Sequence, residues 1–128
     1  GYMQLQDNAP EPLVFIALFS WPMAMHLFSA IPDIEADAKA GVKTTAVWLG
    51  KEKSLMLCAM LWTVFYVSAI VIGSYQPQIY CLIAYPLIPL YILIHKEANI
   101  AKTYWSFPYI NGFIGFLWFL FEITRIYS

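Results

Sequence analysis

The chain has 128 residues, of which 61% are apolar, 18% aromatic and only 12% charged. Soluble domains carry about 25% charged residues, so the charged side chains here are too few to cover a water-soluble globule without large exposed apolar patches. The net charge of −1 excludes the basic surface that binds nucleic-acid phosphates. The composition therefore predicts an integral membrane protein.

Four apolar segments are long enough to cross about 30 Å of hydrocarbon as helices. Helices are favoured because an open β-sheet would leave backbone groups without hydrogen bonds in lipid. We therefore predict an all-α, multi-pass transmembrane bundle with short connections at residues 74–77 and 96–106 and a longer loop at residues 33–53. The four spans cover residues 12–32, 54–73, 78–95 and 107–125.

The first span carries a polar side chain that requires an explanation. His26 lies seven residues before Asp33, which is two turns along the same helical face. A polar group within a span is a functional hypothesis by default, and this imidazole could approach a site at the end of the span or act as a base. An interior histidine held by hydrogen bonds is the alternative.

The loop at residues 33–53 holds eight of the fifteen charged side chains. Within it, Asp33 and Asp37 are four residues apart, so a helix that continues past Pro32 would place both carboxylates on one face. Glu35 would point away from that face. Two like charges repel unless a cation lies between them, and Mg²⁺ typically takes one or two carboxylates, several waters and substrate phosphate oxygens. The pair therefore predicts a Mg²⁺ site.

Groups that bind phosphate follow the two aspartates. Gly41 permits a sharp turn of the backbone, and Lys43, Thr44 and Thr45 then offer a positive charge and two hydroxyls. Together with the acidic pair they predict a metal-assisted diphosphate site at the membrane surface. The alternative is a solvated loop whose charges pair with each other, each pair contributing at most about 1 kcal/mol.

Several other features point to helix packing. A short helix is expected over residues 44–49, closed by Gly50. Cys58 and Cys81 have no metal-ligand spacing, so we expect both to pack as small apolar side chains. We also expect Glu122 and Arg125 to pair, since they are three residues apart. Three prolines inside spans are expected to kink their helices; they are Pro22, Pro86 and Pro89.

The distribution of basic residues predicts the orientation in the membrane. In a four-span topology, the loops at residues 33–53 and 96–106 lie on one side of the membrane, and both ends of the chain lie on the other. Six of the seven basic residues fall on the side of the two loops. Because lysine and arginine are enriched on the cytoplasmic side, both loops are expected to face the cytoplasm.

The stretch from Asp33 to Thr45, DIEADAKAGVKTT, resembles the second aspartate motif of the UbiA superfamily of intramembrane prenyltransferases. That motif is DxxxDxxxG followed by a basic residue and Ser or Thr, in a cytoplasmic loop directly after a transmembrane helix. The family fold has nine helices, and the resemblance implies that this chain corresponds to the last four. The first motif, NDxxDxxxD, does not occur in this sequence.

The resemblance implies roles for individual residues. Asp33 and Asp37 would be catalytic ligands of one Mg²⁺ ion, and Lys43 would contact the prenyl diphosphate. Thr44, Thr45 and His26 complete the expected substrate-binding set. The second metal site would come from an N-terminal half that carries the first motif, so we expect the isolated chain to be inactive.

The expected reaction is Mg²⁺-dependent transfer of a prenyl group from an allylic diphosphate, with dimethylallyl diphosphate as the expected donor. The run SAIPDIE at residues 29–35 is most similar to the lycopene elongase branch, which implies lycopene as the lipophilic acceptor and a prokaryotic cell membrane as the location. Aromatic side chains in the spans could line a prenyl tunnel, although packing or lipid contact is favoured for each; they are Trp62, Phe65, Tyr66, Tyr91 and Trp118.

Three alternatives stay open. The chain could be a non-catalytic membrane subunit or scaffold that pairs with another chain. It could be a transferase of the same superfamily that acts on a quinone or another aromatic acceptor. An ion-coupled transporter is a third, but transporters place acidic residues at mid-depth in the bilayer, whereas Asp33 and Asp37 are expected at a helix end.

Overall fold

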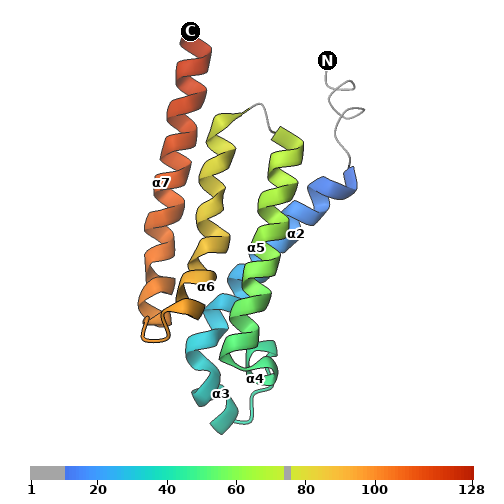
Figure 1. Cartoon of the computed structure of the whole chain (residues 1–128), viewed down its shortest axis with the longest axis vertical. Coiled ribbons are helices and arrows are strands. Elements are labelled where there is room, and N and C mark those ends of the chain that lie inside the picture. The colour runs from blue at the N-terminus through green and yellow to red at the C-terminus, as the bar shows by residue number, and fades with distance from the viewer. Residues whose placement is uncertain (1–10, 74–75) are drawn as a thin grey trace.

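The computed structural model describes residues 11–73 and 76–128, and every regular element in this part of the chain is helical (Figure 1). Four helical stretches are long and apolar enough to cross a membrane, which confirms the predicted all-α transmembrane class. The elements are α2 (Glu11–Ala30), η1 (Ile31–Asp33), α3 (Ile34–Lys39), α4 (Thr45–Leu49), α5 (Lys51–Gly73), η2 (Pro77–Ile83), α6 (Ala84–Ile94) and α7 (Ile100–Tyr127).

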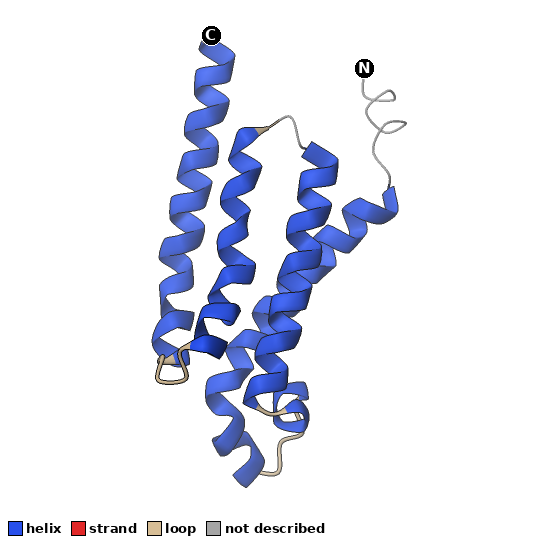
Figure 2. Cartoon of the chain, viewed as in Figure 1, coloured by secondary structure: helices blue, strands red, loops and turns tan. Residues whose placement is uncertain are grey.

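Helix α5 is the central element, since it packs against both α2 and α6. Figure 1 shows α2 crossing behind α5 at an angle, while α7 follows α6 and contacts mainly η2. The short helices α3 and α4 and the α6–α7 connection lie together at the lower end, as the loops in Figure 2 make clear. Helix α2 begins and α7 ends at the opposite end, so the predicted arrangement of the two loops at one end of the bundle is confirmed.

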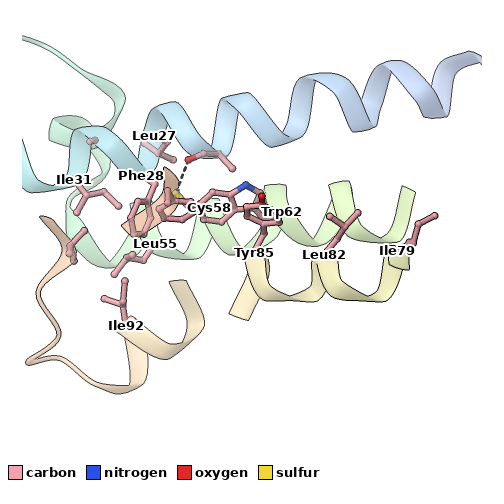
Figure 3. Close-up of a cluster of buried hydrophobic side chains, with 14 residues drawn as sticks. Leu27, Phe28, Ile31, Leu55, Cys58, Trp62, Ile79, Leu82, Tyr85 and Ile92 are labelled. Atoms are coloured by element: carbon pink, nitrogen blue, oxygen red, sulfur yellow. Dashed lines mark hydrogen bonds between the residues drawn. The ribbon is translucent and has the colours of Figure 1, made fainter. Parts of the chain in front are cut away.

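An aromatic cluster joins the four long helices. Phe28 of α2, Trp62 of α5 and Phe107 of α7 are fully buried, and their ring centroids lie 5.3–5.7 Å apart. Tyr85 of α6 adds a fourth ring, 5.9 Å from Trp62 (Figure 3). Its hydroxyl donates a hydrogen bond of 2.5 Å to Oδ1 of Asn111 on α7. Each pair of packed aromatic rings stabilises the fold by about 0.5–1.5 kcal/mol beyond the effect of the apolar area that it buries.

The packing predictions for Cys58 and for the Glu122–Arg125 pair are confirmed by the contacts that these residues make. Cys58 is buried between α5 and α2, where its Sγ donates to the carbonyl oxygen of Ala24 at 3.5 Å (Figure 3). Near the end of α7, Nη2 of Arg125 lies 2.7 Å from Oε2 of Glu122.

Two predicted boundaries are wrong for identifiable reasons. The third span starts as a 3₁₀ helix over Pro77–Ile83, and α-helical geometry begins only at Ala84. Pro86 falls in the first turn of α6, the one place in an α-helix where its missing N–H costs nothing.

The fourth span begins at Ile100 rather than at residue 107, so the predicted loop at residues 96–106 is reduced to about five residues. Asn99 causes the early start, because its Oδ1 caps the helix by accepting a hydrogen bond of 3.1 Å from the Lys102 N–H.

The remaining helix boundaries agree more closely with the sequence. Helix α5 begins at Lys51, three residues before the predicted start of the second span. Pro22 and Pro89 lie inside α2 and α6, as predicted, and Pro108 lies inside α7 because that helix starts early. The predicted connection at residues 74–77 falls partly outside the described residues.

Replacing Trp62 by alanine would remove the ring that contacts Phe28, Tyr85 and Phe107. Aromatic-to-alanine changes in cores cost about 3–5 kcal/mol, so we expect a clear fall in the melting temperature of the full-length protein in detergent. Met60→Ala, on an exposed face of the same helix, should melt close to the unmodified protein. Equal melting temperatures for the two variants would contradict a core centred on Trp62.

Candidate active site

The two aspartates stand where the first membrane helix leaves the apolar region. Helix α2 runs through η1 into α3 without a break in helical structure, so Asp33 and Asp37 lie about one helical turn apart. Asp33 is exposed and Asp37 is half-buried. The Asp33 side chain does not cap α3, although the residue occupies the N-cap position. Within the described residues, neither carboxylate forms a side-chain hydrogen bond or an ion pair.

The alternative of a loop held by surface ion pairs finds little support in the described residues. There, the only ion pair involving residues 33–53 joins Oε1 of Glu52 to Nζ of Lys96 at 3.9 Å, and both side chains are exposed. Exposed pairs of this length contribute little to stability. Lys39, Lys43, Lys51 and Lys53 form no ion pair within the described part of the chain.

Helix α3 ends in a Schellman motif that reverses the chain. The N–H of Val42 donates to the carbonyl oxygen of Asp37 at 2.9 Å, and the N–H of Gly41 donates to that of Ala38 at 3.2 Å. Gly41 has φ of 74°, a conformation that costs other residues about 1–3 kcal/mol. The predicted turn at Gly41 is confirmed, and it directs Lys43 back toward the membrane helices.

Helix α4 follows as predicted. The Oγ1 of Thr44 accepts a hydrogen bond of 3.1 Å from the Val47 N–H, so this threonine is the N-cap. Gly50 ends the helix with φ of 82° and leads directly into α5. These two residues fix the segment between the turn at Gly41 and the start of α5. Thr44 therefore has a structural role that the sequence interpretation did not assign to it.

A cavity of about 600 Å³ lies between α2, α5 and the segment Lys43–Thr45, and we call it the α2–α5 groove. Its wall on α2 is formed by six residues between Phe19 and Ala30, which include His26. On α5 the wall consists of Leu57 and Leu61. The groove is polar at Lys43, Thr44 and Thr45 and apolar along most of its length, with His26 as its one imidazole.

Four of the six residues singled out from the sequence thus meet around one cavity. His26 is exposed toward the groove, and its side chain forms no hydrogen bond within the described residues. Within the described residues, His26 is therefore not held by side-chain hydrogen bonds, and its role stays a prediction. Asp33 and Asp37 do not line the groove; they lie on η1 and α3, which follow Ala30, the last α2 residue of its wall.

Sequence reasoning missed the apolar wall of the groove. Phe19, Met23 and His26 recur at the three- and four-residue spacing of one helical face, and this pattern could have indicated the α2 side. Nothing local identifies Leu57 and Leu61, since they reach the groove only through the packing of α5 on α2. The aromatic residues considered for a prenyl tunnel do not line this groove; Trp62, for example, belongs to the buried cluster.

The residues present fit a partial metal site. The described residues contain no group of three or more His, Cys, Asp or Glu side chains that could hold a metal ion. Two carboxylates one turn apart match Mg²⁺, which typically takes one or two carboxylates and completes its shell with water and phosphate oxygens. They would not satisfy a metal that requires three or four protein ligands.

Comparison with known proteins agrees with the motif. Residues 2–120 match the UbiA prenyltransferase family. The chain belongs to this family. It is 33% identical over 98% of its length to the lycopene elongase/hydratase of Haloferax volcanii, and 33% identical over 94% to that of Halobacterium salinarum. It is 31% identical over 93% of its length to the chloroplastic homogentisate solanesyltransferase of Arabidopsis thaliana.

The chain spans about two fifths of the length of its haloarchaeal relatives, 41% and 42%, and 32% of the plant enzyme. No solved structure matches it. The resemblance inferred from DxxxDxxxG is therefore confirmed at the level of the UbiA family and its lycopene elongase relatives.

Thr44→Val would remove the cap of α4 while keeping the shape of the side chain. Loss of an N-cap costs about 1 kcal/mol, so the amide protons of Val47 and its neighbours should exchange with deuterium about fivefold faster in the full-length protein. Thr45→Val is the matched control, because the Thr45 hydroxyl makes no hydrogen bond among the described residues. Unchanged exchange in Thr44→Val would show that the cap does not hold α4.

Proposed function

We propose that this chain is the C-terminal, four-helix part of a nine-helix UbiA prenyltransferase. The complete enzyme would transfer a prenyl group from an allylic diphosphate, with dimethylallyl diphosphate as donor and lycopene as acceptor. The observation that carries the proposal is the α2–α5 groove, which joins a cationic, hydroxyl-bearing end at Lys43–Thr45 to a long apolar wall. A prenyl diphosphate has the same division into a charged head and an apolar chain.

In this proposal the residues of the groove bind the two parts of the donor separately. The ammonium of Lys43 holds the diphosphate, and the hydroxyls of Thr44 and Thr45 donate hydrogen bonds to its oxygens. The carbon–oxygen bond then breaks, and its electron pair leaves with the diphosphate. Positive groups placed where this charge develops are usually the largest single contribution to such catalysis.

The allylic cation left behind is attacked by a carbon–carbon double bond of the acceptor. The resulting cation becomes neutral either by losing a proton from carbon or by adding water and then losing a proton from the added oxygen. His26 is the one imidazole in the wall of the groove, and it is therefore the residue of this chain best placed to accept a proton there. In this proposal His26 and Lys43 act in different steps, because His26 accepts a proton after the diphosphate held by Lys43 has left.

Asp33 and Asp37 would hold Mg²⁺ at the polar end of the bundle. When bound, the ion neutralises charge on the departing diphosphate. The exposed position of Asp33 and the half-buried position of Asp37 support this role, because both leave room for water and phosphate oxygens. A segment outside this chain would supply the first aspartate motif and the second metal site, so the chain alone should have no activity.

The membrane location follows from the same features. Four apolar helices and haloarchaeal relatives support an integral protein of a prokaryotic cell membrane. The lysines of the α3–α4 region and of the α6–α7 connection lie at one end of the bundle. The enrichment of basic residues on the cytoplasmic side supports an active site that opens to the cytoplasm.

An aromatic acceptor is the second candidate. The plant relatives are named as homogentisate prenyltransferases and a naringenin 8-dimethylallyltransferase, with identities of 26–34% to this chain. Incubation of the full-length enzyme with dimethylallyl diphosphate and either lycopene or homogentisate separates the candidates by the mass of the product. Transfer to neither acceptor, from any allylic donor, would favour the non-catalytic subunit.

Asp33→Asn and Asp37→Asn keep the size of each side chain and remove its charge. We expect each to lower prenyl transfer by the full-length enzyme by roughly 10²–10³-fold, the effect typical of losing one group that stabilises developing charge. Glu35→Gln is the control, since Glu35 is exposed on the same short helix and has no role in the proposal. Turnover close to normal in both aspartate variants would overturn the metal assignment.

Lys43→Met keeps most of the length of the side chain and removes the ammonium. We expect a similar 10²–10³-fold loss of kcat/KM for the diphosphate donor, with little change in the KM of the acceptor. Lys39→Met, in the last turn of α3, controls for loss of a positive charge at this end of the bundle. Equal effects of the two substitutions would indicate a general electrostatic contribution rather than a contact of Lys43 with the donor.

A further inference from the structure

The α2–α5 groove has a defined far end. Along α2 its wall extends from Ala30, next to the polar segment, to Phe19, which lies about 16 Å away at 1.5 Å per residue. Along α5 the wall ends at Leu61, ten residues and about 15 Å from the start of that helix at Lys51. The two helices run in opposite directions (Figure 1), so Phe19 and Leu61 bound the groove at a similar depth.

The residues one turn beyond Phe19 and Leu61 lie outside the groove. One turn further along α5, the ring of Phe65 packs edge-on against Tyr85 with a centroid distance of 6.2 Å, as part of the aromatic cluster. One turn further along α2, Phe15 is exposed and does not line the groove. Phe19 itself is 64% exposed, so its ring stands at the rim and can be shortened without opening the core.

A donor anchored by its diphosphate must direct its prenyl chain along this wall. The polar anchor at Lys43–Thr45 is fixed by the turn at Gly41 and by the cap at Thr44. Because the head cannot slide, each added isoprene unit moves the apolar end of the donor closer to Phe19 and Leu61. These side chains have no polar atoms, so they can select a donor only by the space that they occupy.

We propose that Phe19 and Leu61 set the length of the prenyl chain that the enzyme accepts. The inference rests on the proposed function, because it assumes that the groove holds the donor. Removing either side chain lengthens the groove, toward Phe15 in one case and toward Phe65 in the other. The variants therefore gain activity with a longer donor and keep activity with the shorter one.

The test measures kcat/KM of the full-length enzyme for dimethylallyl and geranyl diphosphate, with one acceptor. Phe19→Ala and Leu61→Ala are expected to raise the ratio of geranyl to dimethylallyl activity at least tenfold, the lower end of the discrimination that an apolar pocket gains from one methylene. Phe15→Ala and Met60→Ala are the matched controls on the same two helices, and both side chains are exposed outside the groove. They should leave the ratio unchanged.

The outcomes distinguish the two proposals. Normal transfer with an unchanged ratio in Phe19→Ala and Leu61→Ala, or an equal change in the controls, would overturn the length assignment and leave the transferase intact. Absence of transfer from either donor by the unmodified enzyme would overturn the proposed function itself. Phe19→Leu provides a milder shortening at an exposed position, so the test does not depend on the half-buried Leu61 alone.

Discussion

The hydrocarbon core of the bilayer offers no hydrogen bonds and strongly disfavours charge. Most of this chain obeys that constraint by forming apolar helices, and its charged residues gather where the helices end. A diphosphate site must nevertheless lie beside an apolar groove if a prenyl donor is to be held by both of its parts. In the function that we propose, the turn at Gly41 meets both demands, because it brings Lys43 back beside α2 and α5 at one end of the α2–α5 groove.

The groove depends on the way α2 and α5 cross. The fully buried rings of Phe28 and Trp62 hold the two helices together, and Cys58 adds a contact with the backbone of α2. Aromatic packing on one side of this crossing leaves the other side open between the two helices. The catalytic chemistry that we propose therefore relies on a core that contains none of the proposed catalytic residues.

The sequence predicts the class of the fold because lipid imposes a simple rule on segment length and polarity. It also predicts part of the local structure of the loop, since Gly41 and Gly50 can adopt the positive φ that ends a helix. The cap at Thr44 was not assigned from the sequence. The starts of the helices at Ala84 and Ile100 could not be predicted from the sequence in the same way. They depend on where Pro86 is tolerated and on the Asn99 cap, and neither feature changes the hydropathy pattern.

The candidate site was predicted in part for a similar reason. Lys43, Thr44 and Thr45 follow one another in the chain, so their common location needs no tertiary information. Leu57 and Leu61 lie in a uniformly apolar helix, and only the crossing of α2 and α5 shows that they face the groove. Local motifs thus indicated the polar end of the site, whereas its apolar end emerged from packing.

Photo-crosslinking with a prenyl diphosphate analogue that carries a photoreactive group at the end of its chain tests the central claim most directly. The full-length enzyme would be irradiated with the analogue and digested, and the modified residues identified by mass spectrometry. We predict adducts on α2 and α5 along the groove, close to Phe19, Met23 and Leu61, that unlabelled donor suppresses. Adducts confined to α6 and α7 would contradict the assignment of the α2–α5 groove as the prenyl site.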